Sequence, residues 1–122
     1  MKEIKLKFWN REKKKMSRPY TLADLAYEGF PSQYTNEYDD LLDDECEVLQ
    51  FTGLTNNGQE WCEGDILEND RDWYQISWSI DEARWEAVGI RATSETLALS
   101  ELLSSETWVQ GNIYQNPELL SS

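Results

Sequence analysis

Hydrophobic and polar residues alternate along several short stretches of the chain, which is typical of half-buried β-strands. The clearest stretch runs from residue 72 to residue 80, where Tyr74, Ile76, Trp78 and Ile80 fall on one face of an extended backbone. We expect Trp78 to belong to the core, because it shares this face with large apolar neighbours. Similar patterns predict strands over residues 4–9, 47–52, 60–67, 85–90 and 107–114.

Turn-forming residues separate the predicted strands. Thr55–Gln59 contains Asn-Asn-Gly, which indicates a hairpin because Asn and Gly tolerate positive φ, and Asp81–Arg84 has the composition of a second hairpin turn. Thr21–Asp24 resembles a capping box and predicts a short helix that ends near Tyr27. The Ser/Leu-rich run from Ser94 to Ser105 leaves two interpretations open, a short helix or a loop with one helical turn.

These elements predict a mainly β fold, either a bent antiparallel sheet or a partly open barrel, with one or two short helices. At 122 residues the chain has room for one hydrophobic core, so we expect a single domain spanning residues 1–122. No stretch approaches the roughly 20 consecutive apolar residues of a membrane helix. Charges also occupy the N-terminal stretch where a signal peptide is apolar, so we expect a cytoplasmic protein without membrane contact.

The charge of the chain is strongly negative and uneven. The formal net charge is −13, but residues 1–20 carry +6, which leaves −19 for the remainder. Such a negative field repels phosphates and disfavours general nucleic-acid binding, although the acidic part could imitate a nucleic-acid backbone and occupy a host protein's DNA site. The basic N-terminal segment is either a solvated hairpin tip or a docking element for an acidic surface, its own or that of a neighbouring subunit.

The residue types that most often carry catalysis are missing. The chain has no histidine, and no phosphate-binding loop or dinucleotide motif occurs, so we predict no catalytic residue, no metal site and no cofactor. Any enzymatic activity would depend on carboxylates alone. Glu63-Gly64-Asp65 has two interpretations: its acids bind a cation or orient a water, or they satisfy backbone donors in a tight turn that glycine permits.

Two further groups are candidates for a functional surface. The acidic run Asp39–Glu47 is either a cation site or a solvated loop, and it lacks the spacing and turn glycine of an EF-hand. Five tryptophans are either core or a stacking platform: Trp61, Trp73, Trp78, Trp85 and Trp108. Of these, Trp61 and Trp73 join Glu63 and Asp65 as candidates. Trp73 lies on the strand face opposite Trp78, where an uncovered apolar patch would suit a protein partner or a second subunit.

Two segments resemble a known family. Residues 50–66, QFTGLTNNGQEWCEGDI, and residues 111–120, GNIYQNPELL, resemble the signatures of the YopX family of phage and prophage proteins, as does the N-terminal strand with its basic turn. The resemblance implies a mainly β, barrel-like fold and a phage or prophage origin, but no particular activity. Residues 20–45 match no family pattern. The residues that carry the resemblance are Thr52, Gly53, Leu54, Gly58, Glu63, Gly64, Asp65, Gly111, Asn112, Ile113, Tyr114, Asn116 and Pro117.

Together these features favour a phage accessory protein that is not an enzyme. We expect it to bind a host or phage protein, or to form a homo-oligomer through exposed sheet edges or aromatic faces. Two alternatives stay open. One is a metal-dependent enzyme or ligand-binding protein that uses carboxylates around Glu63 and Asp65, and the other is the acidic nucleic-acid mimic.

Overall fold

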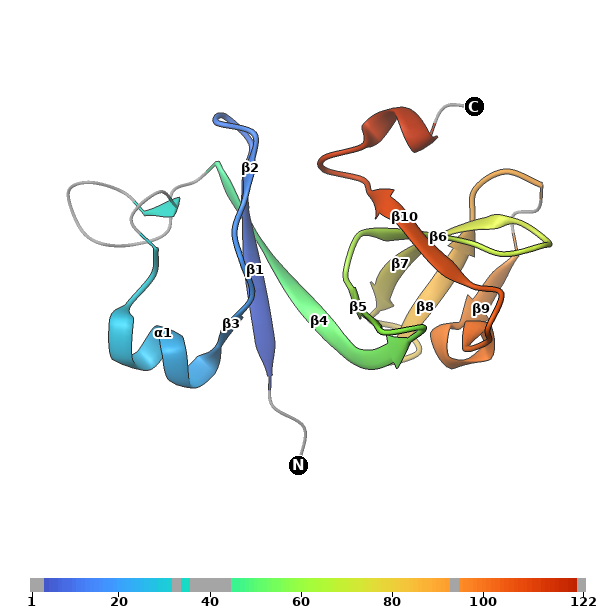
Figure 1. Ribbon diagram of the computed structural model, residues 1–122, viewed down its shortest axis with the longest axis horizontal. Coiled ribbons are helices and arrows are strands. Elements are labelled where there is room, and N and C mark those ends of the chain that lie inside the picture. The colour runs from blue at the N-terminus through green and yellow to red at the C-terminus, as the bar shows by residue number, and fades with distance from the viewer. Residues whose placement is uncertain (1–3, 32–33, 36–44, 93–94, 121–122) are drawn as a thin grey trace. The chain divides into compact units, whose positions relative to one another are not determined.

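The computed structural model describes residues 4–31, 34–35, 45–92 and 95–120. The chain groups into two compact units, residues 1–51 and residues 52–122. Each unit is built on antiparallel strands, and the described part of the chain contains one short α-helix together with 3-10 helices (Figure 1). The predicted mainly β fold is therefore confirmed.

The first unit is organised around strand β1. This strand pairs antiparallel with β2, with β3 and with the first half of β4. Its Phe8 is fully buried and lies 5.8–6.0 Å, between ring centroids, from Tyr20, Phe30 and Tyr34. Edge and tilted contacts of this kind stabilise a small aromatic core. The strands are β1 (Lys5–Asn10), β2 (Lys15–Met16), β3 (Tyr20–Thr21) and β4 (Cys46–Asn56).

The helix α1 (Leu22–Glu28) begins at the predicted capping box. The amide of Asp24 donates to Oγ1 of Thr21, and the amide of Thr21 donates back to Oδ2 of Asp24, both at 3.0 Å. The second bond favours the carboxylate and holds the pKa of Asp24 below its ordinary value. The helix ends before Gly29, whose φ of 75° no helical residue adopts.

The second unit contains a five-stranded antiparallel sheet in the order β10-β6-β7-β8-β9 (Figure 1). Four strands follow one another as a meander, and β10 returns to the open edge beside β6. The second half of β4 forms a hairpin with β5 through the predicted Asn-Gly turn. The elements are β5 (Gln59–Cys62), β6 (Asp65–Glu68), β7 (Trp73–Ser79), β8 (Arg84–Gly89), β9 (Thr96–Ala98), η2 (Leu99–Leu102), β10 (Trp108–Asn112) and η3 (Pro117–Leu120).

The structure divides one predicted strand and adds a short strand that was not predicted. The strand predicted over residues 60–67 is divided into β5 and β6, because Gly64 takes a φ of 86°. The run from Ser94 to Ser105 contributes the short strand β9, which neither interpretation included, and then a single 3-10 turn, as in the second interpretation. Residues 39–44 of the acidic run lie outside the described residues, and Glu45–Glu47 lead into β4.

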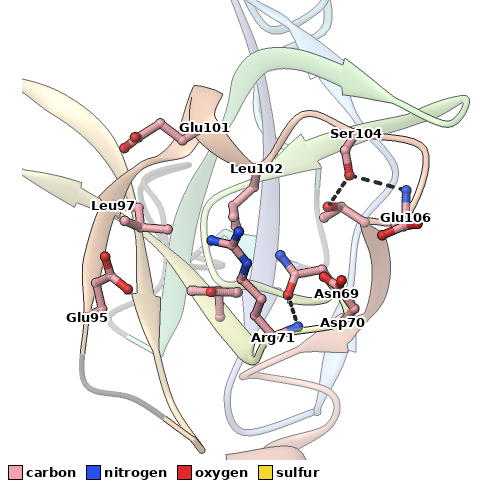
Figure 2. Close-up of a pocket in the computed structure, with 11 residues that line it drawn as sticks. Asn69, Asp70, Arg71, Glu95, Leu97, Glu101, Leu102, Ser104 and Glu106 are labelled. Carbon is pink, nitrogen blue, oxygen red and sulfur yellow. Dashed lines mark hydrogen bonds between the residues drawn. The ribbon is translucent and has the colours of Figure 1, made fainter.

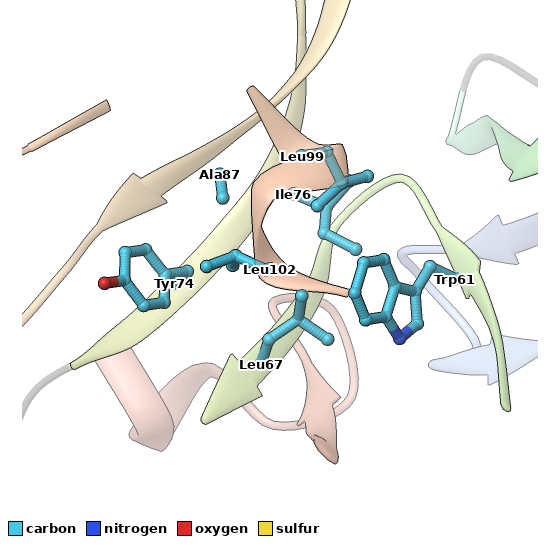
Figure 3. Close-up of a cluster of buried hydrophobic side chains, with 7 residues drawn as sticks. All are labelled: Trp61, Leu67, Tyr74, Ile76, Ala87, Leu99 and Leu102. Atoms are coloured by element: carbon cyan, nitrogen blue, oxygen red, sulfur yellow. The ribbon is translucent and has the colours of Figure 1, made fainter. Parts of the chain in front are cut away.

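The hydrophobic core of the second unit lies between the sheet, β5 and η2. Figure 3 shows Trp61 at one end of this cluster and Tyr74 at the other. The buried members are Trp61, Leu67, Tyr74, Ile76, Ala87, Leu99 and Leu102.

The expectation that Trp78 belongs to the core is wrong. Its side chain is 47% exposed and packs edge-on against Trp85, with ring centroids 5.2 Å apart. The reason is the length of β9, which pairs only with residues 86–88 of β8. Beyond that level β7 and β8 continue as a two-stranded hairpin, so the part of the sheet that carries Trp78 extends past the shorter strand β9.

Substitutions of Trp61 can show whether the volume of its side chain or its hydrogen bonding stabilises this core. Its side chain is fully buried, and its Nε1 has no hydrogen-bond partner among the described residues. We expect W61A to lower the free energy of unfolding by about 3–5 kcal/mol. W61F should cost clearly less, because phenylalanine keeps most of the volume and removes an unsatisfied N–H. Urea unfolding of both variants measures this, and equal losses would contradict it.

Candidate functional site

The Glu63–Asp65 segment forms the turn between β5 and β6. Oδ2 of Asp65 accepts a hydrogen bond from the amide of Cys62 at 2.8 Å, and the Asp65 side chain is buried. The amide of Gly64 donates to the carbonyl of Ile76 at 3.0 Å. The carboxylate of Asp65 therefore serves a backbone donor within the turn, while Glu63 is half-buried beside it.

The same turn is held against the C-terminal signature segment. The amide of Ile113 donates to the carbonyl of Gly64 at 2.9 Å. A Cβ at residue 64 would lie 2.6 Å from Cε2 of Tyr114, which is closer than two carbon atoms can approach. Oδ1 of Asn112 accepts hydrogen bonds from the amides of Tyr114 and Gln115, at 3.0 and 2.8 Å, and so fixes the turn that presents the Tyr114 ring.

The two tryptophan candidates occupy different environments. Trp61 lies in the core, whereas Trp73 is half-buried beneath the guanidinium of Arg91, 3.6 Å from the ring centroid. This cation–π contact covers part of the face on which an apolar patch was expected. None of the four candidates, Trp61, Trp73, Glu63 and Asp65, lines the cavity that the second unit contains near Tyr74.

A cavity of about 430 Å³ opens elsewhere in the second unit (Figure 2). Its size lies within the range of about 300–1,000 Å³ that is usual for ligand pockets. We call it the acidic pocket. It is lined by Asn69, Asp70, Arg71, Tyr74, Glu95, Leu97, Glu101, Leu102, Ser104, Glu106 and Thr107.

The lining carries a strong negative charge. It contains four carboxylates and only one basic side chain, that of Arg71. Figure 2 shows Glu95 and Glu101 on one side of Arg71 and Asp70 and Glu106 on the other. A single guanidinium cannot neutralise four carboxylates, so the pocket attracts cations.

The lining is mainly polar, but it also includes three apolar or aromatic side chains, those of Tyr74, Leu97 and Leu102. Tyr74 and Leu102 belong to the buried core, and the half-buried Leu97 packs against them. Such a site suits a lysine or arginine side chain, whose aliphatic stem can contact the two leucines while its charged end meets the carboxylates.

The wall formed by residues 104–107 is supported by the β4–β5 hairpin. Nδ2 of Asn56 donates to the carbonyls of Ser104 and Thr107, both at 2.9 Å. Nδ2 of Asn57 donates to the carbonyl of Thr107 at 2.9 Å and lies within hydrogen-bond distance of two neighbouring carbonyls. In another part of the lining, Oδ1 of Asn69 accepts from the amide of Arg71 at 2.8 Å and fixes that turn.

The pocket is better suited to a polyatomic cation than to a bare metal ion. Within residues 4–31, 34–35, 45–92 and 95–120, no group of three or more His, Cys, Asp or Glu side chains is arranged to hold a metal. The hydroxyls of Ser104 and Thr107, 3.1 Å apart, add neutral hydrogen-bonding groups to the wall. An ammonium or guanidinium group can use several such oxygens together.

Sequence reasoning did not identify these pocket residues. The available signals were the polar turn Asn69–Arg71 and the acids Glu95, Glu101 and Glu106 within a Ser/Leu-rich run. Neither signal has a spacing characteristic of a binding site. The residues become neighbours only because β9 joins the sheet beside β8 and the following η2 packs against the side chains of β7.

The pocket also affects the ionisation of its buried tyrosine. Burial raises the pKa of Tyr74 above its ordinary value of 10.0, and the negative charges of Asp72 and Glu95 raise it further. The positive charge of Arg71 and a hydrogen bond with Asn69 act in the opposite direction. Because the pKa is raised on folding, this tyrosine contributes stability below pH 10 that is lost as the pH rises through its folded pKa.

Tyr74 can therefore report the charge within the pocket. We expect E95Q to lower the pKa of Tyr74, because it removes a negative neighbour, and R71Q to raise it, because it removes a positive one. The pKa of Tyr74 in each variant can be measured by NMR titration of protein with ¹³C-labelled tyrosine. The Y74F variant identifies the Tyr74 resonance by its loss. Shifts of the same sign in the two variants would contradict the arrangement.

Gly64 and Gly58 form a matched pair for testing the contact with Tyr114. Both have positive φ, 86° and 74°, so alanine at either position costs about 1–2 kcal/mol in backbone strain. Only residue 64 has a neighbour within 4 Å of the added Cβ. We expect G64A to lose about 1–3 kcal/mol more than G58A in urea unfolding. Equal losses would show that the ring moves aside freely.

Comparison with known proteins places this fold. The crystal structure of protein EF1440 from Enterococcus faecalis is similar with a TM-score of 0.62 and 20% sequence identity, over 97% of this chain and 98% of that chain. That likeness concerns the fold alone. A comparison with curated proteins finds no match. Among the described residues, no helix has the length and apolar character required to span a membrane.

The family assignment comes from the sequence. A family model described as YopX protein matches residues 5–121, which is nearly the whole chain. Both segments that carry the resemblance, residues 50–66 and residues 111–120, lie within this match. The chain therefore belongs to the YopX family.

Proposed function

We propose that this protein is a phage or prophage accessory protein that acts in the host cytoplasm by binding and not by catalysis. Its ligand is a positively charged segment of a protein, held in the acidic pocket of the second unit. The observation that carries the proposal is the lining of that cavity, which combines four carboxylates and one guanidinium with the apolar side chains of Leu97 and Leu102.

The physical basis is the match between this lining and a basic side chain. A lysine or arginine brings a stem of methylene groups that gains from contact with Leu97 and Leu102. Its charged end gains from carboxylates on both sides of the pocket, where the nearby core lowers the local dielectric constant. A bare metal ion could bind the carboxylates but would gain nothing from contact with the two leucines.

The charge of the whole chain favours the same class of ligand. A net charge of −13 steers a basic segment towards the protein and increases its association rate. This long-range effect weakens with salt, because the screening length falls to about 10 Å at 0.1 M ionic strength. The binding free energy contributed by the pocket must therefore be measured separately from the attraction due to net charge.

The binding test uses a fluorescein-labelled hexalysine peptide and two variants with the same change in composition and charge. D70N/E106Q removes two carboxylates from the pocket, while D81N/E82Q removes two from the exposed β7–β8 turn of the same unit. We expect roughly tenfold weaker binding by D70N/E106Q, at up to about 1 kcal/mol for each lost charge pair. D81N/E82Q should bind nearly as the unmodified protein does.

Fluorescence anisotropy at constant ionic strength measures these affinities. None of the four substituted side chains belongs to the core, so both variants should keep the unfolding transition of the parent. Equal weakening in the two variants would show that hexalysine responds only to net charge, and the pocket would then lose its proposed role.

A further inference from the structure

The first unit presents a basic hairpin tip. Strands β1 and β2 pair through Trp9 with Met16 and Asn10 with Lys15, so residues 11–14 form the connecting turn. Oδ1 of Asn10 accepts a hydrogen bond from the amide of Lys13 at 2.9 Å, and Lys14 has a φ of 53°. These features hold a tight turn in which Lys13, Lys14 and Lys15 are all exposed.

The positive charge of this tip is only partly neutralised within its own unit. Arg11 is used locally, since it pairs with Glu45 at 3.4 Å and also with Glu47. For Lys13, Lys14 and Lys15, by contrast, no carboxylate among the described residues lies within ion-pair distance. The three lysines at this hairpin tip are therefore exposed and, within the described residues, form no ion pair.

We infer that the acidic pocket of one copy receives the Lys13–Lys15 hairpin tip of a second copy of this chain. The inference rests on the proposed function, because it names the basic segment that the pocket holds. The two surfaces are complementary in charge: the tip offers three ammonium groups, and the pocket offers four carboxylates with one guanidinium.

The form of the ligand also agrees with the pocket. A hairpin turn projects adjacent side chains from a backbone that is already ordered, so binding costs less conformational entropy than for a flexible peptide. The methylene stems of the lysines can lie on Leu97 and Leu102 while their ends reach the rim.

This contact joins two different surfaces, so the resulting assembly is head-to-tail. Each copy carries one tip and one pocket, and successive copies form a closed ring or an open chain according to the rotation between them. Two copies can also exchange their tips reciprocally. In each case the assembly is electrostatic and should weaken as the salt concentration rises.

The experiment measures molar mass by size-exclusion chromatography with light scattering, at about 0.05 M and about 0.5 M NaCl. We expect the full chain to assemble at low salt and to be largely monomeric at high salt. K13E/K14E makes the tip acidic, and D70K/E106K makes the pocket basic. Each variant alone should be monomeric at low salt, whereas the control D81K/E82K should assemble as the unmodified protein does.

The mixture of the two charge-reversed variants is the decisive sample. It combines a basic tip with an acidic pocket, and an acidic tip with a basic pocket, so assembly should return when equal amounts of K13E/K14E and D70K/E106K are mixed. A mixture that stays monomeric, or an unmodified chain that is monomeric at low salt, overturns the inference.

The hexalysine peptide separates this inference from the proposed function. If the chain is monomeric at low salt but binds hexalysine through Asp70 and Glu106, the pocket keeps its function and the second copy is excluded as its ligand. If hexalysine binding does not depend on these carboxylates, the proposed function itself fails. If both proposals hold, added hexalysine should dissociate the assembly by competing for the pocket.

Discussion

The second unit depends on the close approach of two backbone segments that are far apart in the sequence. The turn at Gly64 lies so near the ring of Tyr114 that no side chain fits between them, and the amide of Ile113 donates to the carbonyl of Gly64. This contact fastens the end of β10 to the start of β6 and so sets the register of the sheet edge. The meander β6–β9 then closes one side of the core that extends from Trp61 to Tyr74.

The family signature and the pocket are physically connected, although they share no residue. The Asn56 and Asn57 amides at the tip of the β4–β5 hairpin hold the carbonyls of residues 104–107, and this loop carries part of the pocket wall. The signature residues therefore shape the scaffold, while the pocket charge comes from residues such as Glu106 outside the signature. In a small domain, glycine and asparagine residues at turns are needed for the fold, whereas charged surface residues are not. The surface charges can therefore serve binding.

Local interactions were readable from the sequence, and the tertiary ones were not. The two-residue period of β7, the Asn-Gly turn and the capping box at Thr21 each depend on neighbours a few residues away, so the pattern alone predicts them. The exposure of Trp78 depends instead on where β9 stops, and the acidic pocket depends on η2 packing against the side chains of β7. The charge distribution predicts part of the proposed interaction, because the first segment is basic and the remainder of the chain is acidic. The expected single domain stays a prediction.

The side-chain amide of Asn57 has a chemical consequence for the ageing of the protein. Asparagine followed by glycine is the pair that most readily cyclises and loses its amide to hydrolysis, and Asn57 precedes Gly58 in an exposed turn. Deamidation would replace a donor with a carboxylate directed at the carbonyls of Ser104, Ser105 and Thr107. The new carboxylate would repel these carbonyl oxygens. The loop would then be held by the side-chain amide of Asn56 without that of Asn57. A stored sample would thus accumulate molecules that are one charge more acidic and have a loosened pocket wall.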